Sequence, residues 1–262
     1  MIEQTIASSG KVAVVGHRGA MGYAPENTLA SFAKAAELGA HAFECDVHLT
    51  GDGEAVVIHD ATVERVSNGH GVVAEMTLAE LRQLDVGSWF QAAGQMPSSE
   101  YAGQRIPTLA EALDISLRLG LDIVVELKGE PEPPRRLIER VVYLIAERAM
   151  QDRVAVISFN HPSLSLVRQL DDRIPTGILF GHGIPDPVAE AKLFGASSIR
   201  PHYSRITMQL AEETHEAGMC LHAWTVNESD LAETLIGLGV DSIGTNYPDR
   251  IRRLLVQSNR LA

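Results

Sequence analysis

The chain is poor in cysteine, aromatic residues and basic charge. Its 262 residues include 2 cysteines, 5% aromatic residues, and 22 lysine and arginine residues against 34 aspartate and glutamate residues. A net charge of −12 leaves no basic excess for binding nucleic acid or an anionic membrane surface, so we expect neither as a partner. A small anionic substrate is compatible with this charge, because it responds to the local field of its site.

Further absences bear on the compartment. Cys45 and Cys220 lie far apart, each in an apolar strand-like stretch, which favours two buried free thiols and a reducing environment over a disulfide. The segment Met1–Gly10 has neither the basic start nor the apolar core of a secretory signal. No run approaches the roughly 18 apolar residues of a membrane span. These features predict a cytoplasmic protein and leave its oligomeric state open.

Strand-like and helix-like segments alternate along the chain. Short apolar runs are typical of buried parallel strands, and apolar residues at helical spacing separate them. The strand candidates are Val12–Val15, Ala42–Leu49, Ala55–Ile58, Leu121–Leu127, Val154–Ile157, Ile178–Phe180, Ser198–Ile199, Cys220–Val226 and Ser242–Thr245. About eight strand–helix units result, which predicts an α/β fold, a (β/α)₈ TIM barrel, as a single domain over residues 1–262.

One stretch departs from the alternation. Between Asp60 and Pro107 lie the turn signal Asn68-Gly69, the loop Gln91–Gly103 and a capping box, Thr77-x-x-Glu80. We predict a small insertion after the second barrel strand, at roughly residues 60–105, packed over the barrel mouth. A second capping box, Thr108-x-x-Glu111, predicts the start of a helix.

Three carboxylates lie at the ends of predicted strands. Glu44 and Asp46 are two residues apart, so their side chains share one strand face while Cys45 points to the other. At the carboxyl end of a barrel strand the shared face is the interior, where two carboxylates repel unless a cation lies between them. Glu126 ends a different strand and can complete the ligand set. Carboxylate oxygens suit one hard divalent cation, Mg²⁺ or Ca²⁺. Solvated surface acids are the alternative interpretation, and the combination of residues favours metal ligands.

The reactive residues form an ordered series of motifs. They are His17-Arg18-Gly19, Pro25-Glu26-Asn27-Thr28, Glu44-Cys45-Asp46, Ile58-His59-Asp60, Glu126-Leu127-Lys128 and Trp224-Thr225-Val226-Asn227. The series resembles the glycerophosphodiester phosphodiesterase family from about Val14 to Asp249. Two departures stand out: Val66-Ser67 replaces a Thr pair common in the family, and Asn246 stands where many members carry Asp. We expect neither to touch the metal or acid–base residues.

Two histidines follow apolar strand-like runs, His17 after Val12–Val15 and His59 after Val56–Ile58. A single histidine at such a point is more often structural, but two beside an acidic cluster favour catalysis. Histidine gives and takes protons near neutral pH. The resemblance implies that both act as general acid and base, and which does which stays open.

The remaining candidates would contact the substrate. Arg18 has a fork that matches two phosphate oxygens, and Lys128 shares a strand face with Glu126. Structural ion pairs are the alternative for both cations. Glu26 lies in a segment that caps a helix and can also orient Arg18 or a histidine. Trp224 suits a wall against a glycerol group, although a lone tryptophan is more often part of a core.

The resemblance implies metal-dependent hydrolysis of glycerophosphodiesters, small molecules, to glycerol 3-phosphate and an alcohol. It also implies that the glycerol 2-hydroxyl attacks phosphorus and that water opens the resulting cyclic phosphate. A phospholipase D-like enzyme acting on lysophospholipids would need an apolar groove, for which the sequence shows no obvious loop. A catalytically inactive, metal-stabilised binding protein would be expected to lack a histidine or a ligand. A barrel isomerase or aldolase would leave the three carboxylates unexplained.

Overall fold

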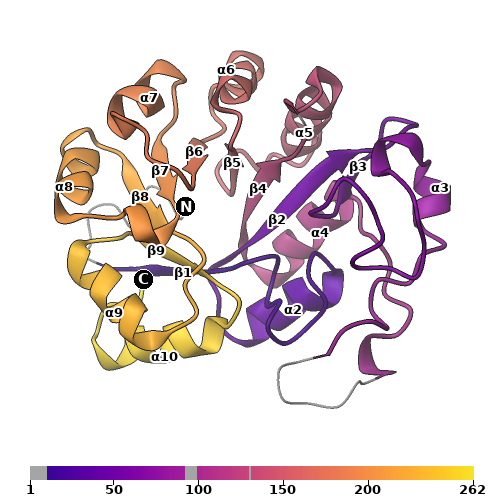
Figure 1. Cartoon of the computed structure of the whole chain (residues 1–262), viewed down its shortest axis with the longest axis horizontal. Coiled ribbons are helices and arrows are strands. Elements are labelled where there is room, and N and C mark those ends of the chain that lie inside the picture. The colour runs from indigo at the N-terminus through magenta and orange to yellow at the C-terminus, as the bar shows by residue number, and fades with distance from the viewer. Residues whose placement is uncertain (1–10, 92–98, 130) are drawn as a thin grey trace.

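A parallel sheet closed into a barrel forms the centre of the molecule (Figure 1). The computed structural model describes residues 11–91, 99–129 and 131–262. Within them the barrel strands are β1 (Ala13–Gly16), β2 (Ala42–Leu49), β4 (Asp122–Leu127), β5 (Val154–Ser158), β6 (Thr176–Phe180), β7 (Ser198–Pro201), β8 (Cys220–Ala223) and β9 (Ser242–Thr245). Closure occurs at β1, where Val15 pairs in parallel with Ala42 of β2 and Gly244 of β9. The predicted barrel is confirmed.

Helices surround the strands on the outside (Figure 1). They are α2 (Leu29–Glu37), α4 (Leu109–Leu119), α5 (Arg135–Glu147), α6 (His161–Leu170), α7 (Pro187–Leu193), α8 (Met208–Glu216), α9 (Ser229–Leu238) and α10 (Pro248–Gln257). Their apolar stripes bury Leu113, Leu137 and Leu164 completely against the barrel's outer face. The predicted capping box at Thr108 and Glu111 is confirmed at the start of α4. Of the helices described, none is both long and apolar enough to cross a membrane.

The insertion after the second barrel strand is confirmed and has its own small core. It begins with β3 (Ala55–Val57), which pairs antiparallel to β2, and it contains η1 (Val73–Glu75), α3 (Leu78–Leu81) and η2 (Ser99–Tyr101). The side chains that form its core are Val56, Ile58, Val63, Val66, Val73, Leu81, Val86 and Ile106. The predicted strand at Ala55–Ile58 therefore belongs to the insertion and not to the barrel. Part of the predicted loop, residues 92–98, lies outside the described residues.

Alternation along the strands separates two environments. Cys45 points outward into the core beneath the helices, and both Cys45 and Cys220 are buried free thiols, as predicted. Inward-facing residues form an apolar layer across the barrel, made by Val15, Ala42, Val124, Ile157 and Leu179. The charged residues of the predicted site lie at the carboxyl ends of the strands, where barrel enzymes place their chemistry.

Candidate active site

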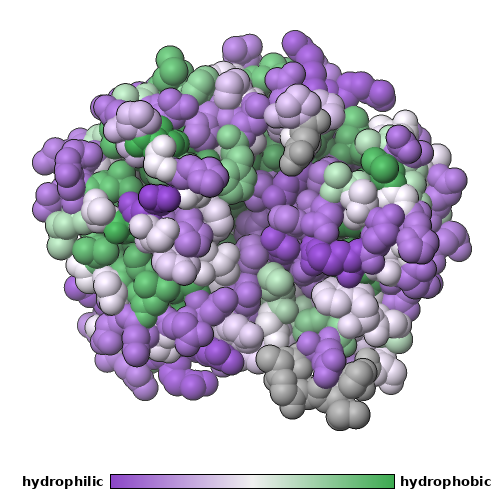
Figure 2. Space-filling model, viewed as in Figure 1, coloured by the Kyte–Doolittle hydropathy of each residue, from purple (hydrophilic) through white to green (hydrophobic). Residues whose placement is uncertain are grey.

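A cavity of about 190 Å³ opens at the carboxyl ends of the strands. Hydrophilic side chains surround the hollow near the centre of the face in Figure 2. Its lining includes His17, Arg18, Glu44, His59, Glu126, Lys128, Phe159, Arg200, His222 and Trp224. The fold thus gathers residues from both ends of the chain around one space.

The three predicted ligand carboxylates meet beside this cavity. Glu44 and Asp46 lie on β2. Glu126 lies on the neighbouring strand β4, where it pairs with Asp46. One oxygen from each carboxylate lies within 4.8 Å of the others, and all three residues are buried. Burial and the charge of Asp46 raise the pKa of Glu126 to about 7. Burial and the neighbouring carboxylates Asp46 and Glu126 also raise the pKa of Glu44. A bound cation would relieve the repulsion that adds to the effect of burial.

Two cations neutralise part of this acidic cluster. The Lys128 ammonium lies 3.0 Å from Asp46 Oδ1 and 2.5 Å from Glu126 Oε1. The Arg18 guanidinium Nε lies 3.2 Å from Asp46 Oδ2. Burial by itself raises the pKa of Asp46, but Lys128 and Arg18 outweigh that effect and hold it below its usual range. Asn27 donates a further 2.8 Å hydrogen bond to Asp46 Oδ2. Asp46 is therefore the carboxylate that stays ionised.

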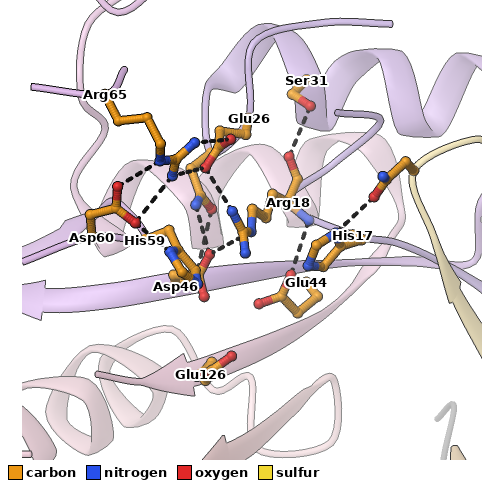
Figure 3. A network of polar contacts seen from close by, with 12 residues as sticks. His17, Arg18, Glu26, Ser31, Glu44, Asp46, His59, Asp60, Arg65 and Glu126 are labelled. Atoms are coloured by element: carbon orange, nitrogen blue, oxygen red, sulfur yellow. Dashed lines mark hydrogen bonds and ion pairs between the residues drawn. The ribbon is translucent and has the colours of Figure 1, made fainter. Parts of the chain in front are cut away.

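Arg18 is fixed by its backbone as well as by its side chain. It has a φ of 50°, a left-handed conformation uncommon outside glycine, directly after β1. Its backbone N–H donates to Glu44 Oε2 at 3.0 Å, and its Nη1 lies 2.8 Å from Glu26 Oε1 (Figure 3). Glu26 therefore contacts Arg18, and its role in orienting that side chain stays a prediction. The guanidinium thus faces the cavity beside the carboxylates.

His17 contacts Asn246, which corrects an expectation made from the sequence. The His17 ring Nδ1 lies 2.8 Å from Asn246 Oδ1, so the departure at position 246 does touch the proposed acid–base pair. The strand pairing of β1 with β9 brings these two residues together across the barrel closure. Burial, together with the charge of Arg18, lowers the pKa of His17 to about 4. The ring is consequently neutral at physiological pH.

His59 has a different kind of partner. It follows β3, and its Nδ1 lies 2.6 Å from Asp60 Oδ1. Its backbone carbonyl is held by the His48 ring Nε2 at 3.0 Å. Burial lowers the pKa of His59, while the carboxylates of Asp46 and Asp60 oppose that shift. The ring of His17 therefore contacts an amide, whereas the ring of His59 contacts a carboxylate.

Trp224 also lines the cavity. Its indole N–H donates to the carbonyl of Arg200 at 2.7 Å, which fixes the ring. The half-exposed Phe159 meets it edge to face, with ring centroids 5.6 Å apart. The sequence analysis missed Phe159, although its position just after β5 is the same strand-end signal that identified the other residues.

A family model described as the glycerophosphoryl diester phosphodiesterase family matches residues 17–250. The chain belongs to this family. A glycerophosphodiester phosphodiesterase of Caldanaerobacter subterraneus subsp. tengcongensis is 37% identical and covers 94% of this chain and 98% of its own length. A Bacillus subtilis glycerophosphodiester phosphodiesterase is 31% identical over 95% of this chain and 88% of its own length.

Structural comparison agrees with this assignment. An Oleispira antarctica phosphodiesterase, solved in complex with the product sn-glycerol-3-phosphate, is 31% identical and superimposes with a TM-score of 0.87. The match covers 95% of this chain and 99% of that one. The two proteins therefore share the barrel over nearly the whole of both chains.

Proposed function

We propose that this family member hydrolyses glycerophosphodiesters to sn-glycerol 3-phosphate and an alcohol. One observation carries the proposal: two cations, two histidines and two carboxylates of an acidic triad line a single cavity at the mouth of the barrel, and the third carboxylate lies beside them. Family membership and the product-bound relative support the same reaction. The buried free thiols of Cys45 and Cys220 favour the cytoplasm as the place of action.

Glu44, Asp46 and Glu126 are the residues that would hold a divalent cation. Their donor set fits one, because three carboxylates converge and two of them have raised pKa values. Oxygen ligands suit Mg²⁺ or Ca²⁺. When bound, such a cation neutralises charge on the phosphoryl group and lowers the pKa of a hydroxyl close to it.

Arg18 and Lys128 are placed to bind the phosphate. Both side chains line the cavity, and both are held in position by the buried Asp46. The guanidinium offers a planar fork of donors, and the ammonium offers a point charge. Trp224 and Phe159 then provide an apolar wall for the carbon atoms of the glycerol group.

The partners of the two histidines divide the proton transfers. The Asn246 amide oxygen accepts only, so its contact requires the proton on His17 Nδ1 and leaves Nε2 as an acceptor. With a pKa of about 4, His17 is a neutral general base. The Asp60 carboxylate opposes the lowering of the His59 pKa by burial and favours a proton on its ring, so of the two histidines we assign His59 as the general acid.

These roles allow the substrate to supply its own nucleophile. His17 takes the proton of the glycerol 2-hydroxyl, whose oxygen forms a bond to phosphorus while the bond to the alcohol oxygen breaks. His59 protonates that departing oxygen, and a cyclic phosphate results. In the second step the roles reverse: His59 takes a proton from water, water opens the ring, and His17 returns the proton to the 2-hydroxyl.

The reaction is tested by product analysis. The protein should release sn-glycerol 3-phosphate from the choline, ethanolamine or glycerol diester in the presence of Mg²⁺ or Ca²⁺, as measured by phosphorus NMR. Asp46→Asn serves as the matched control, because it keeps the shape of the side chain while removing the charge that organises the site. Absence of glycerol 3-phosphate with every diester and both cations would contradict the proposal.

A further inference from the structure

An arginine of the insertion connects the two halves of the charged site. Arg65 Nη1 and Nη2 each lie 2.8 Å from a carboxylate oxygen of Glu26. The same guanidinium contacts Asp60, with Nε 2.6 Å from Oδ2 and Nη2 3.2 Å from Oδ1. Figure 3 shows Arg65 between these two carboxylates. Four hydrogen bonds of the Arg65 guanidinium are therefore made to two carboxylates that neighbour the proposed catalytic groups.

Each of these two carboxylates also contacts a second side chain of the site. Asp60 Oδ1 lies 2.6 Å from the His59 ring Nδ1, and Glu26 Oε1 lies 2.8 Å from Arg18 Nη1. One branch thus leads from Arg65 to the proposed general acid, and the other leads to the proposed phosphate-binding cation. Glu26 is buried and would be costly to leave with an unpaired charge.

The position of Arg65 itself is set by the insertion's own core. Val63 and Val66, two residues before it and one after it, are both buried in that core. Ser67 Oγ closes the turn by donating to the Val63 carbonyl at 2.7 Å. The guanidinium is therefore presented by a fixed turn and not by a free loop.

We propose that Arg65 is a positioning residue that aligns His59 through Asp60 and Arg18 through Glu26, so that both reach the substrate in one geometry. The inference rests on the proposed function, because it assigns catalytic roles to His59 and Arg18. Arg65 does not line the cavity, so it acts through the two carboxylates. The insertion would then be part of the active site's framework.

Kinetics separate positioning from a structural role. Arg65→Ala should lower kcat by about 10- to 100-fold, a loss expected when a proton-transfer group is misplaced. It should also raise KM, because Arg18 loses its anchor. Arg65→Lys, which keeps the charge but cannot fork between two carboxylates, should fold more readily and show a smaller loss in both constants. Adding Asp60→Asn to Arg65→Ala should cost kcat much less than the product of the single losses.

Arg82→Ala is the matched control. Arg82 belongs to the same insertion and forms an ion pair with Glu111, but neither residue lines the cavity. If Arg65 only stabilises the insertion, Arg82→Ala and Arg65→Ala should lower Tm and activity in parallel. A selective loss of kcat in the Arg65 variants, at equal Tm, supports positioning.

A spectroscopic measurement makes the inference independent of turnover. In protein labelled with ¹⁵N at histidine, His59 should show a proton on Nδ1 that is protected in the wild type and exchanges rapidly in Arg65→Ala and Arg65→Lys. This result is expected even if the wild type hydrolyses no glycerophosphodiester, which would refute only the proposed function. An unchanged His59 signal together with kcat within twofold of Arg82→Ala would overturn the inference.

Discussion

Asn246 meets the ring of His17 with an amide oxygen, 2.8 Å from Nδ1. A carboxylate at the same place would carry a full negative charge and would favour the protonated ring. The amide fixes the ring's orientation without that charge, and the pKa of His17 falls to about 4 because of burial and Arg18. The amide at position 246 therefore leaves burial and Arg18 to lower the pKa of His17, an effect that a carboxylate there would oppose.

Replacing this amide should move the pH profile. Asn246→Asp places a carboxylate against His17 and raises its pKa, so the acidic limb of kcat/KM should shift to higher pH. The sign follows because the base must be neutral and activity is lost as pH falls through its pKa. Profiles should be recorded at saturating metal ion. Asn227→Asp is the control. Asn227 contacts the Asn246 backbone and not the His17 ring, so this substitution adds the same charge without placing it against the ring. An Asn246→Asp limb that coincides with the wild type would remove His17 as the base.

Metal ions should stabilise the fold more at pH 8 than at pH 5. The folded pKa of Glu126, about 7 because of burial and Asp46, exceeds its ordinary value. The folded state then holds a proton that the unfolded state has lost, so metal-free stability decreases as pH rises from about 4.3 toward 7. A divalent cation replaces that proton, and at 100 times Kd it adds about 2.7 kcal/mol.

Thermal unfolding with and without Mg²⁺ or Ca²⁺ at the two pH values measures this effect. Glu126→Gln should flatten the pH dependence and lose most of the metal-induced rise in Tm. Equal metal-induced rises at both pH values would argue against the triad as the ligand set.

The proposed acid can be tested with an activated leaving group. His59→Ala should reduce kcat for the choline diester by about 10²- to 10⁴-fold. With a nitrophenyl diester the loss should be far smaller, because nitrophenolate departs without a proton. His17→Ala should be impaired with both substrates. The rates are measured as release of choline or nitrophenol. If His59→Ala lost the same factor in kcat with both substrates, His59 would not be the acid.

The 2-hydroxyl of the substrate should be indispensable. A 2-deoxyglycerol diester should bind, since Arg18 and Lys128 still meet its phosphate, and its inhibition constant should be close to the parent KM. It should turn over orders of magnitude more slowly, because well-oriented intramolecular attack can reach effective molarities of about 10⁵ M. The 1-deoxy analogue keeps the nucleophile and should remain a substrate. Equal turnover of the 2-deoxy and parent diesters would make water the nucleophile.

Strand ends made most of this site predictable. Glu44 and Asp46 follow from two-residue alternation on one strand, and barrel topology places Glu126 near them. The same reasoning located His17 just after β1. Local pattern suffices here because the carboxyl ends of neighbouring parallel strands meet at one rim.

The local sequence pattern could not predict contacts between segments that are distant in the chain. The pair His17 and Asn246 is 229 residues apart, and Arg65 is 39 residues from Glu26. Such pairs depend on barrel closure and on the packing of the insertion, which no local signal encodes. Strand direction was similarly hidden: Ala55–Val57 has the apolar, β-branched composition of a barrel strand but folds back antiparallel on β2.

The proposed catalytic and phosphate-binding residues and the aromatic wall come from different parts of the chain, although Arg200 and His222 also line the cavity from the later strands. Arg18, Glu44, Asp46, His59, Glu126 and Lys128 all precede residue 129, whereas Phe159, Leu179 and Trp224 come from strands later in the barrel. Either set of residues can therefore be substituted without changing the other. We therefore expect substitutions at Phe159 or Trp224 to change which diester is accepted more than they change the phosphate chemistry.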